Sequence, residues 1–282
     1  MQDSIRKADI LIEALPYLQA FRGKVIVAKY GGSAIDNPTA MRGILQDLVF
    51  LSVVGLRPIL VHGGGPAITR KLAARGHETI FIDGMRVTDR ATVQLVDDAL
   101  TEVNHRLVRQ VRSLGGQAQG VVAHDRVVVA SPHPRAKELG FVGSVRRVRA
   151  ARLRAILGRH VVPVVSPIGS AGRQRYNINA DTVASHVAAE LRAEKLVLLT
   201  NVRGILRQPG KAESLLSTVS VRETARLVKS GVVQSGMIPK VAACVEALQH
   251  GVKKAHIIDA AIPHAMLLEI FTKQGIGTEI VR

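Results

Sequence analysis

The sequence predicts an α/β protein: a three-layer α/β/α sandwich in which helices cover both faces of a mainly parallel central sheet, preceded by a kinked N-terminal helix. Three observations predict this fold. Apolar runs rich in β-branched residues alternate along the chain with longer segments of helical periodicity. Two of these runs, 25–28 and 58–61, contain no charged residue, as is typical of strands buried on both faces of a parallel sheet. The 282 residues are 47% hydrophobic, which is enough to bury a large core as one domain or two lobes.

The first 20 or so residues predict a helical arm ahead of the first core strand. Its apolar positions recur at helical spacing at Ile5, Ala8, Ile12 and Leu15. Pro16 is expected to kink or end this helix. The apolar stripe needs a partner, which is either the body of the same chain or another subunit.

After the arm, strands alternate with helices. The predicted elements are a strand at 24–30, a helix at about 38–54, a strand at 58–62, and helices at about 66–75 and 90–114. Pro66 is expected in the first turn of its helix, where a backbone N–H has no partner in any case. Between 117 and 150 the pattern becomes short and irregular, which is typical of a hairpin or a β-rich insert.

The second half of the chain continues the alternation. The predicted elements are a helix at about 150–158, a strand at 161–169, a helix beginning within 177–181, a strand at 195–200, helices at 220–231 and 239–250, a strand at 255–259, and a last helix at about 264–269 before the terminal segment 275–281. Strands that alternate with helices indicate a parallel sheet, because parallel neighbours need a long crossover connection.

The net charge of +17 arises from 39 basic and 22 acidic residues, and arginines are densest at 146–154. Aromatic residues make up only 3% of the chain and Trp is absent, so platforms for stacking nucleic-acid bases are scarce. We therefore interpret the charge as a solvated basic surface with a bias toward anionic substrates, and we expect no nucleic-acid partner.

The sequence shows no pattern typical of a membrane-spanning segment or of a secretory signal. No apolar run approaches the roughly 20 residues that span a bilayer, and charges interrupt the N-terminal segment in a way that does not fit a secretory signal. The single cysteine, Cys244, rules out an intramolecular disulfide and is expected to be a small buried residue. We expect a cytoplasmic protein without a membrane partner.

Glycine turns follow the first two predicted strands, at 31–32 and 63–65. A loop without side chains lets backbone N–H groups approach an anion, and Lys29 adds a full positive charge beside the first loop. The two turns therefore predict a phosphate or carboxylate site. The P-loop and dinucleotide-binding patterns are both absent, so a nucleotide enzyme would have to be of another architecture.

Seven segments in order resemble the amino-acid kinase family, and within it the kinases that act on N-acetyl-L-glutamate. The segments are KYGGS at 29–33, VHGGGP at 61–66, DGMRVTD at 83–89, YNINAD at 176–181, LLTNVRGIL at 198–206, GMIPK at 236–240 and HAMLLEIFTKQGIGT at 264–278. The resemblance implies ATP-dependent phosphorylation of the γ-carboxylate of N-acetyl-L-glutamate to N-acetyl-L-glutamyl 5-phosphate, the second step of arginine biosynthesis. A related kinase of an aminoadipate derivative in lysine biosynthesis and a non-catalytic sensor of the same fold are the alternatives.

The resemblance implies that Lys29 and Lys240 neutralise charge in phosphoryl transfer and that Asp181 holds both lysines by ion pairing. A general base is not needed, because a carboxylate oxygen has no proton to lose. The cofactors implied are ATP and Mg²⁺, the metal being bound mainly through the ATP phosphates.

Further roles are implied for residues of the other motifs. Substrate would be bound by Gly64, Gly65, Arg86 and Asn177. Nucleotide would be bound by Gly31, Gly32, Thr200, Asn201, Gly204, Gly236 and Met237. The sequence departs from the family pattern at three places. Asn201 stands where the family usually has Asp, and Ala260 stands where the family commonly has Gly. The segment VVAHD at 121–125 stands where the family tends to have a Gly-rich turn. These departures concern the nucleotide contacts rather than the two lysines.

The arm and the C-terminal motif resemble those of arginine-inhibited members. The resemblance implies an L-arginine site at Tyr17, Glu269, Gly275 and Gly277, and a dimer that assembles into a hexamer as a trimer of dimers. It divides the chain into an arm for oligomerisation or regulation (1–22), an N-terminal lobe for N-acetylglutamate and dimerisation (23–192), and a C-terminal lobe for ATP and arginine (193–282). Whether a nitrogen-signalling protein also binds stays open.

Overall fold

The computed structural model describes residues 1–208, 210–272 and 275–282, so residues 273 and 274 of the predicted C-terminal motif lie outside the described part. An eight-stranded sheet forms the centre of the molecule, in the order β12-β14-β13-β11-β1-β2-β8-β5. Its strands are β1 (Val25–Tyr30), β2 (Arg57–His62), β5 (Ala118–Val121), β8 (Val162–Val165), β11 (Lys195–Thr200), β12 (Thr218–Ser220), β13 (Lys254–Asp259) and β14 (Thr278–Val281). Every pair is parallel except β13 with β14.

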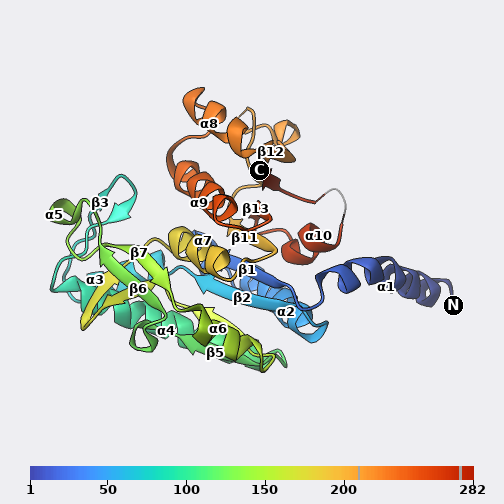
Figure 1. Cartoon of the computed structure of the whole chain (residues 1–282), viewed down its shortest axis with the longest axis horizontal. Helices are drawn as coiled ribbons and strands as arrows, with labels where there is room; N and C mark the ends of the chain where they lie inside the picture. Colours follow the sequence, from blue (N-terminus) through green and yellow to red (C-terminus); the bar gives the residue numbers. More distant parts are fainter. Residues whose placement is uncertain (209, 273–274) are drawn as a thin grey trace.

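Helices cover both faces of this sheet, as the predicted three-layer sandwich requires (Figure 1). One face is covered by α6 (Ala150–Leu157), α7 (Ala180–Glu190) and α9 (Ile238–Gln249). The other is covered by α2 (Pro38–Val53), α4 (Thr92–Ser113) and α10 (Ala265–Phe271). The alternation of β1 divides its side chains between the two cores, Val27 in one and Ile26 and Ala28 in the other. The predicted fold class is confirmed.

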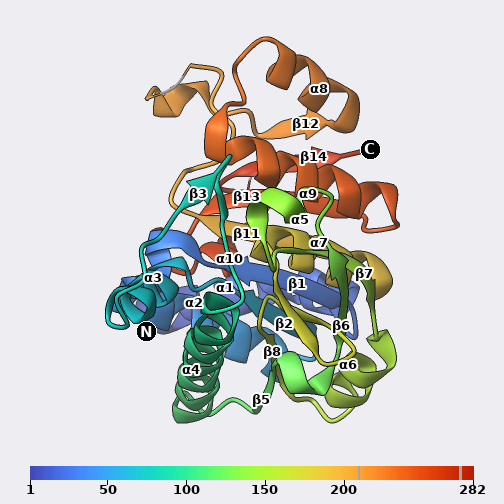
Figure 2. The same ribbon diagram turned by 90° about the vertical axis from the view of Figure 1, so that its left-hand side faces the viewer.

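A second, four-stranded sheet lies beside α7, in the order β10-β9-β6-β7 (Figure 2). It contains β6 (Val128–Pro132), β7 (Gly143–Val148), β9 (Ile168–Ala171) and β10 (Gln174–Asn177). The single strand predicted at 161–169 is wrong: β8 ends at Val165 in the main sheet and β9 begins at Ile168 in the second one. Pro167 lies in the break, where it donates no ladder bond. The strand β5 of the predicted insert likewise belongs to the main sheet.

The remaining elements are short or peripheral. They are α3 (Gly65–Ala73), the hairpin of β3 (Phe81–Ile82) and β4 (Met85–Arg86), α5 (Ala136–Leu139), α8 (Val221–Lys229), and the 3₁₀ turns η1 (Gly32–Asp36), η2 (Ala123–Asp125), η3 (Ala212–Ser214) and η4 (Ser235–Met237). In the described part of the chain, no helix is long and apolar enough to span a membrane. The predicted division at 192–193 falls between α7 and β11 and stays a prediction, since the main sheet contains strands from both sides of it.

The arm is one helix, α1 (Gln2–Phe21), which continues through Pro16 rather than ending there. It projects from the body with the N-terminus at its tip (Figure 1). Large apolar side chains along it stay in solvent, with Ile10, Leu11 and Ile12 between 57% and 67% exposed. Only the C-terminal end of the arm therefore packs on its own chain, through Tyr17 and Phe21, and the exposed apolar side chains of its described N-terminal part are left without cover.

Candidate active site

The two glycine turns meet at the carboxyl ends of neighbouring parallel strands. Tyr30 of β1 lies opposite His62 of β2, so the glycines that follow them come side by side. The Gly63 N–H donates to the Tyr30 carbonyl at 2.7 Å. A Cβ on Gly31 would lie 3.0 Å from the Gly63 Cα, so a side chain at this crossing would press the two turns apart.

Three charged side chains converge beside these turns. The Lys29 Nζ lies 2.9 Å from Oδ1 of Asp181, and the Lys240 Nζ lies 3.6 Å from Oδ2. The contact with Oδ1 is an ion pair rather than an aligned hydrogen bond, because this oxygen has no hydrogen-bond partner. The Lys240 ammonium also donates to the Gly236 carbonyl at 3.2 Å. The Lys29 and Asp181 side chains are 9% and 5% exposed and Lys240 is 22% exposed, so the pairs lie where water screens them poorly.

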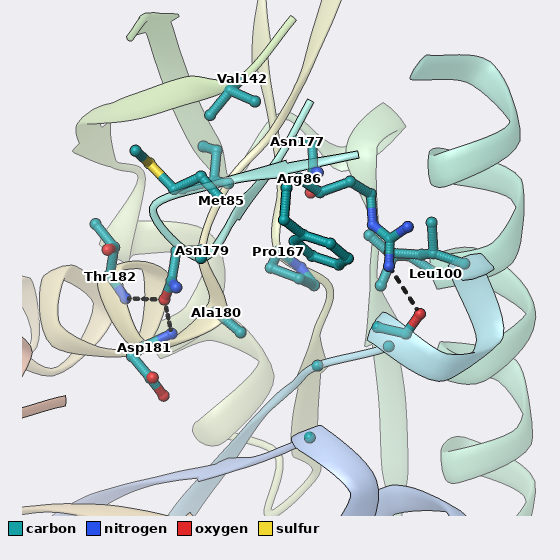
Figure 3. A pocket seen from close by; sticks show the side chains of 18 of the residues that line it. Met85, Arg86, Leu100, Val142, Pro167, Asn177, Asn179, Ala180, Asp181 and Thr182 are labelled. Atoms are coloured by element: carbon teal, nitrogen blue, oxygen red, sulfur yellow. Dashed lines mark hydrogen bonds between the residues drawn. The ribbon is translucent and has the colours of Figure 1, made fainter. Parts of the chain in front are cut away.

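A cavity of about 810 Å³ opens over this cluster (Figure 3). Four cationic side chains line it, Lys29, Arg70, Arg86 and Lys240, and Asp181 is the single carboxylate among its described lining residues. The three glycines at 63–65 line it together with the N-terminus of α3, whose first N–H groups have no partner within the helix. The excess of positive charge and the helix end both favour an anionic ligand.

Arg86 is fixed at the cavity wall by the residues around it. Its Nη2 donates to the Gly65 carbonyl at 3.1 Å and to the Thr69 hydroxyl at 2.9 Å, and its Nη1 donates to Thr79 at 3.0 Å (Figure 3 labels Arg86). Its guanidinium carbon also lies 4.8 Å from the ring centroid of Phe81. Burial lowers the pKa of Arg86, but not enough to discharge an arginine.

Asn177 and Asn179 bring the second sheet and α7 to the same cavity. The Asn177 amide donates to the Thr88 hydroxyl at 3.1 Å. The Asn179 side chain caps α7 by accepting from the N–H groups of Asp181 at 2.8 Å and Thr182 at 3.3 Å (Figure 3). The cap fixes the first turn of α7 and with it the place of Asp181. Sequence reasoning missed this role, although an Asn just before a helical segment is its signal.

The predicted nucleotide residues are divided between two places. Gly32 lines the cavity and Gly31 packs against Gly63. The others lie at the carboxyl end of β11 and the start of α9, namely Thr200, Asn201, Gly204, Gly236 and Met237. The Thr200 hydroxyl is bonded within the turn that follows β11, accepting from the Val202 N–H at 3.1 Å. Asn201 is exposed.

The predicted inhibitor residues are not among those that line the cavity: they lie on α1, on α10 and in the segment just before β14, and α1 contacts α10. The Tyr17 ring packs edge-on against Phe271, with centroids 6.4 Å apart. Glu269 is buried and accepts from His256 Nδ1 at 2.6 Å and from the Ile276 N–H at 2.7 Å. Burial alone would raise the pKa of Glu269, but these bonds and the charge of Lys195 outweigh it and hold the pKa below its usual value.

The two predicted inhibitor glycines are required by packing. Gly275 has a φ of +62°, and a Cβ there would lie 2.9 Å from the Glu269 carboxylate. A Cβ on Gly277 would lie 2.3 Å from the Ile257 carbonyl of β13. Both positions therefore need glycine even without a ligand.

A parallel sheet with two glycine turns at its carboxyl edge, facing two lysines on one carboxylate, defines an α/β protein with a binding site for an anionic group. Residues 24–259 match the family model described as the amino acid kinase family, and the chain belongs to this family. The chain is 44% identical to the acetylglutamate kinase of Desulforamulus reducens, with 100% of this chain and 99% of that protein covered. It is 47% identical to the acetylglutamate kinase of Synechococcus elongatus, with 96% and 91% covered.

Solved structures share the fold. One is the N-acetylglutamate synthase from Neisseria gonorrhoeae complexed with coenzyme A and N-acetyl-glutamate, at a TM-score of 0.85 and 28% identity, covering 96% of this chain. This chain spans only 62% of that synthase. Another is the carbamate kinase from Giardia lamblia bound to AMP-PNP, at a TM-score of 0.70 and 16% identity, covering 92% and 99% of the two chains. At that identity the likeness shows the fold alone.

Proposed function

We propose that the chain phosphorylates the γ-carboxylate of N-acetyl-L-glutamate with ATP, giving N-acetyl-L-glutamyl 5-phosphate for arginine biosynthesis in the cytoplasm. The meeting of Lys29 and Lys240 on Asp181 at a cationic cavity carries the proposal. Full-length similarity to acetylglutamate kinases supports it independently.

The charge balance of the reaction explains why two lysines are needed. The carboxylate and the γ-phosphoryl group are both anionic, so bringing them together costs Coulombic repulsion in a poorly screened site. The two ammonium groups oppose this repulsion and stabilise the charge that spreads over the phosphoryl oxygens in the transition state. Asp181 holds both ammonium groups in place, with one carboxylate oxygen paired to each lysine. His62 does not act as a base, since burial lowers its pKa to about 4 and its ring nitrogens are bonded within the protein.

We propose that ATP lies across the carboxyl ends of β1 and β11 and reaches the start of α9, where the predicted nucleotide residues are. Mg²⁺ would enter with the nucleotide and neutralise phosphate charge there. Mg²⁺ usually keeps several water ligands and binds through substrate phosphates, rather than in a cage made only of protein ligands. Among the described residues, no group of three His, Cys, Asp or Glu side chains that could hold a metal ion occurs.

Arg86 and Asn177 would bind the amino-acid end of the substrate. The guanidinium of Arg86 suits the α-carboxylate, and the Asn177 amide both donates and accepts, as an acetamide requires. We expect Arg86→Lys to raise the KM for N-acetylglutamate by roughly 10- to 100-fold with a smaller change in kcat, because the planar, charged donor group that faces the substrate is lost. Initial rates against substrate concentration measure this. Arg90→Lys, at an exposed neighbouring arginine, is the matched control. An unchanged KM in Arg86→Lys would remove Arg86 from the substrate site.

The activity itself is tested by ADP release with and without N-acetylglutamate. We expect release to depend on this substrate. Replacing N-acetyl-L-glutamate with N-acetyl-L-aminoadipate, one methylene longer, should lower kcat/KM, because the acceptor oxygen would overrun the position set by Arg86. Equal or faster turnover of the longer acid would favour the aminoadipate kinase, and no turnover of either would favour a sensor.

We further propose that L-arginine inhibits the enzyme at the C-terminal site. Glu269 supplies a buried carboxylate, and Tyr17 brings the arm to the same region through Phe271. The expected result for Glu269→Gln is activity that persists at arginine concentrations that inhibit the parent protein, because the carboxylate partner of the guanidinium is gone. Rates measured across an arginine titration test this. Wild-type activity that does not respond to arginine would contradict the proposal.

The uncovered arm supports an oligomeric assembly. We propose that α1 packs against the arm of another subunit and that dimers join into a hexamer through these arms. Deletion of residues 1–21 is expected to reduce the assembly to dimers, since the exposed apolar stripe would be removed. Sedimentation velocity measures the change in mass. A full-length chain that sediments as a monomer would refute the assembly.

A further inference from the structure

His62 is a buried side chain that the proposed reaction leaves without a task. It is the last residue of β2, directly before the glycine turn, and it is fully buried. Its Nδ1 lies 2.8 Å from the Gly63 carbonyl oxygen, and its Nε2 lies 3.1 Å from Nδ2 of Asn104 on α4. The ring therefore connects a helix on one face of the sheet with the first peptide of the turn.

The contacts fix the tautomer of this imidazole. The Asn104 Nδ2 also donates to the Val164 carbonyl of β8 at 2.8 Å, and a carbonyl only accepts, so the amide nitrogen must face both partners. The second proton of this amide goes to Nε2 of His62, which accepts. The Nδ1 must then carry the ring proton and donate it to the Gly63 carbonyl. Both ring nitrogens of the neutral imidazole then have a hydrogen-bond partner.

The bond from His62 to the Gly63 carbonyl also fixes the orientation of the peptide that follows this carbonyl. The carbonyl of Gly63 and the N–H of Gly64 belong to the same trans peptide plane, and they point in opposite directions. A peptide between two glycines has little steric resistance to rotation, because both neighbours tolerate almost any backbone angle. Holding the carbonyl toward His62 therefore holds the Gly64 N–H on the other side, and Gly64 lines the cavity.

We propose that His62 and Asn104 form a lock that keeps the Gly63–Gly64 peptide from flipping, so that the Gly64 N–H stays aimed at the transferred phosphoryl group and the acceptor carboxylate. His62 and Asn104 are then positioning residues that never touch a ligand. The inference rests on the proposed function for the identity of the anion. The lock itself concerns only the backbone of the turn.

Two further contacts place the lock under α4. Leu100, one turn before Asn104, packs so closely beneath Gly64 that a Cβ there would lie 2.6 Å from its Cδ2. The Asn104 Oδ1 lies against Gly120 of β5, where a Cβ would come within 2.3 Å of it. One face of α4 thus supports the turn twice, once by packing and once through hydrogen bonds.

Two substitutions of His62 separate the halves of the lock. Asn places its amide near the position of Nδ1 and keeps the donor to Gly63, whereas Gln reaches the position of Nε2 and keeps the partner of Asn104. We expect His62→Gln to lower kcat roughly 100-fold, the loss typical of one misaimed oxyanion donor. His62→Asn should stay within about tenfold of the parent, since it retains the bond that fixes the peptide. The KM for N-acetylglutamate should change little in either, and thermal unfolding midpoints confirm that both fold.

Gly120→Ala tests the lock from outside the site, because a methyl group there displaces Asn104. We expect it to lower kcat in the same direction as His62→Gln, while Leu107→Val, at a buried α4 residue away from the turn, lowers stability without this loss. Equal kcat for His62→Gln and His62→Asn at similar stability would overturn the proposal.

Imidazole ¹⁵N chemical shifts of the wild-type protein give a readout that needs no activity. The Nδ1–H tautomer of His62 is expected, and the Nε2–H tautomer would overturn the lock even if the kinase reaction is confirmed. Conversely, a Nδ1–H tautomer in a protein without kinase activity would leave the lock standing and remove only its proposed anion.

Discussion

Lys240→Ala is expected to lower kcat by roughly 10²- to 10³-fold, the effect of removing one preorganised charge from a transition state. Lys240 is anchored by Asp181 and by the Gly236 carbonyl, so its ammonium is aimed before the nucleotide arrives. Because its side chain is partly exposed, the change should disturb the fold little. The loss should therefore appear in steady-state kcat with an almost unchanged melting temperature.

Two controls sharpen this test. Lys253→Ala removes an exposed lysine that pairs with Glu194, and it should leave kcat unchanged. Lys240→Arg keeps the charge but replaces a compact ammonium with a planar guanidinium, so it should recover only part of the rate. Parent-like turnover in Lys240→Ala would end the assignment of two cations to the reaction.

Asp181→Asn is expected to cost both activity and stability. Two ammonium groups would lose their carboxylate in a poorly solvated site, and removing one partner of a buried pair typically costs about 3–5 kcal/mol. The lysines would also lose their relative placement, so kcat should fall by roughly 10²-fold or more. Urea unfolding and steady-state rates measure the two losses separately.

Asp47→Asn is the matched control for this experiment. Asp47 is a fully buried carboxylate of α2 that lies 2.6 Å from His264 Nδ1 and accepts from the Met266 N–H, away from the cavity lining. Its substitution should lower stability and leave most of kcat. A double-mutant cycle of Lys29→Met with Asp181→Asn should be strongly non-additive, and additive losses would show that the pair does not act as a unit.

The fold was predictable from the sequence where local pattern and burial agree. Strands β1 and β2 can be recognised in the sequence, because a strand that is buried on both faces appears as a continuous apolar run. The break between β8 and β9 was not predictable in this way, because VVPVVSPIG is apolar throughout. The two strands are distinguished only by their pairing partners. β8 pairs with β2 and β5 in the main sheet, whereas β9 pairs with β10 and β6 in the second sheet.

The candidate site was predictable only in part for a similar reason. The glycine turns are a local signal, but the meeting of Lys29 with Asp181 and Lys240 is a tertiary event that resemblance implied and spacing did not. The tie of His62 to Asn104 joins β2 to α4, and no local pattern distinguishes it from ordinary packing. Contacts of this kind depend on the assembled sheet.

The neighbouring strands β1 and β11 have a consequence for how this molecule moves. Lys29 belongs to β1, Asp181 begins the helix that leads into β11, and the helix of Lys240 packs on that same helix. The spacing of the two ammonium groups is therefore set by the pairing of β1 with β11 and by the packing of α9 on α7. Any closing around nucleotide that moves α9 against α7 changes this spacing, so core substitutions between these two helices are expected to change kcat without contacting a ligand.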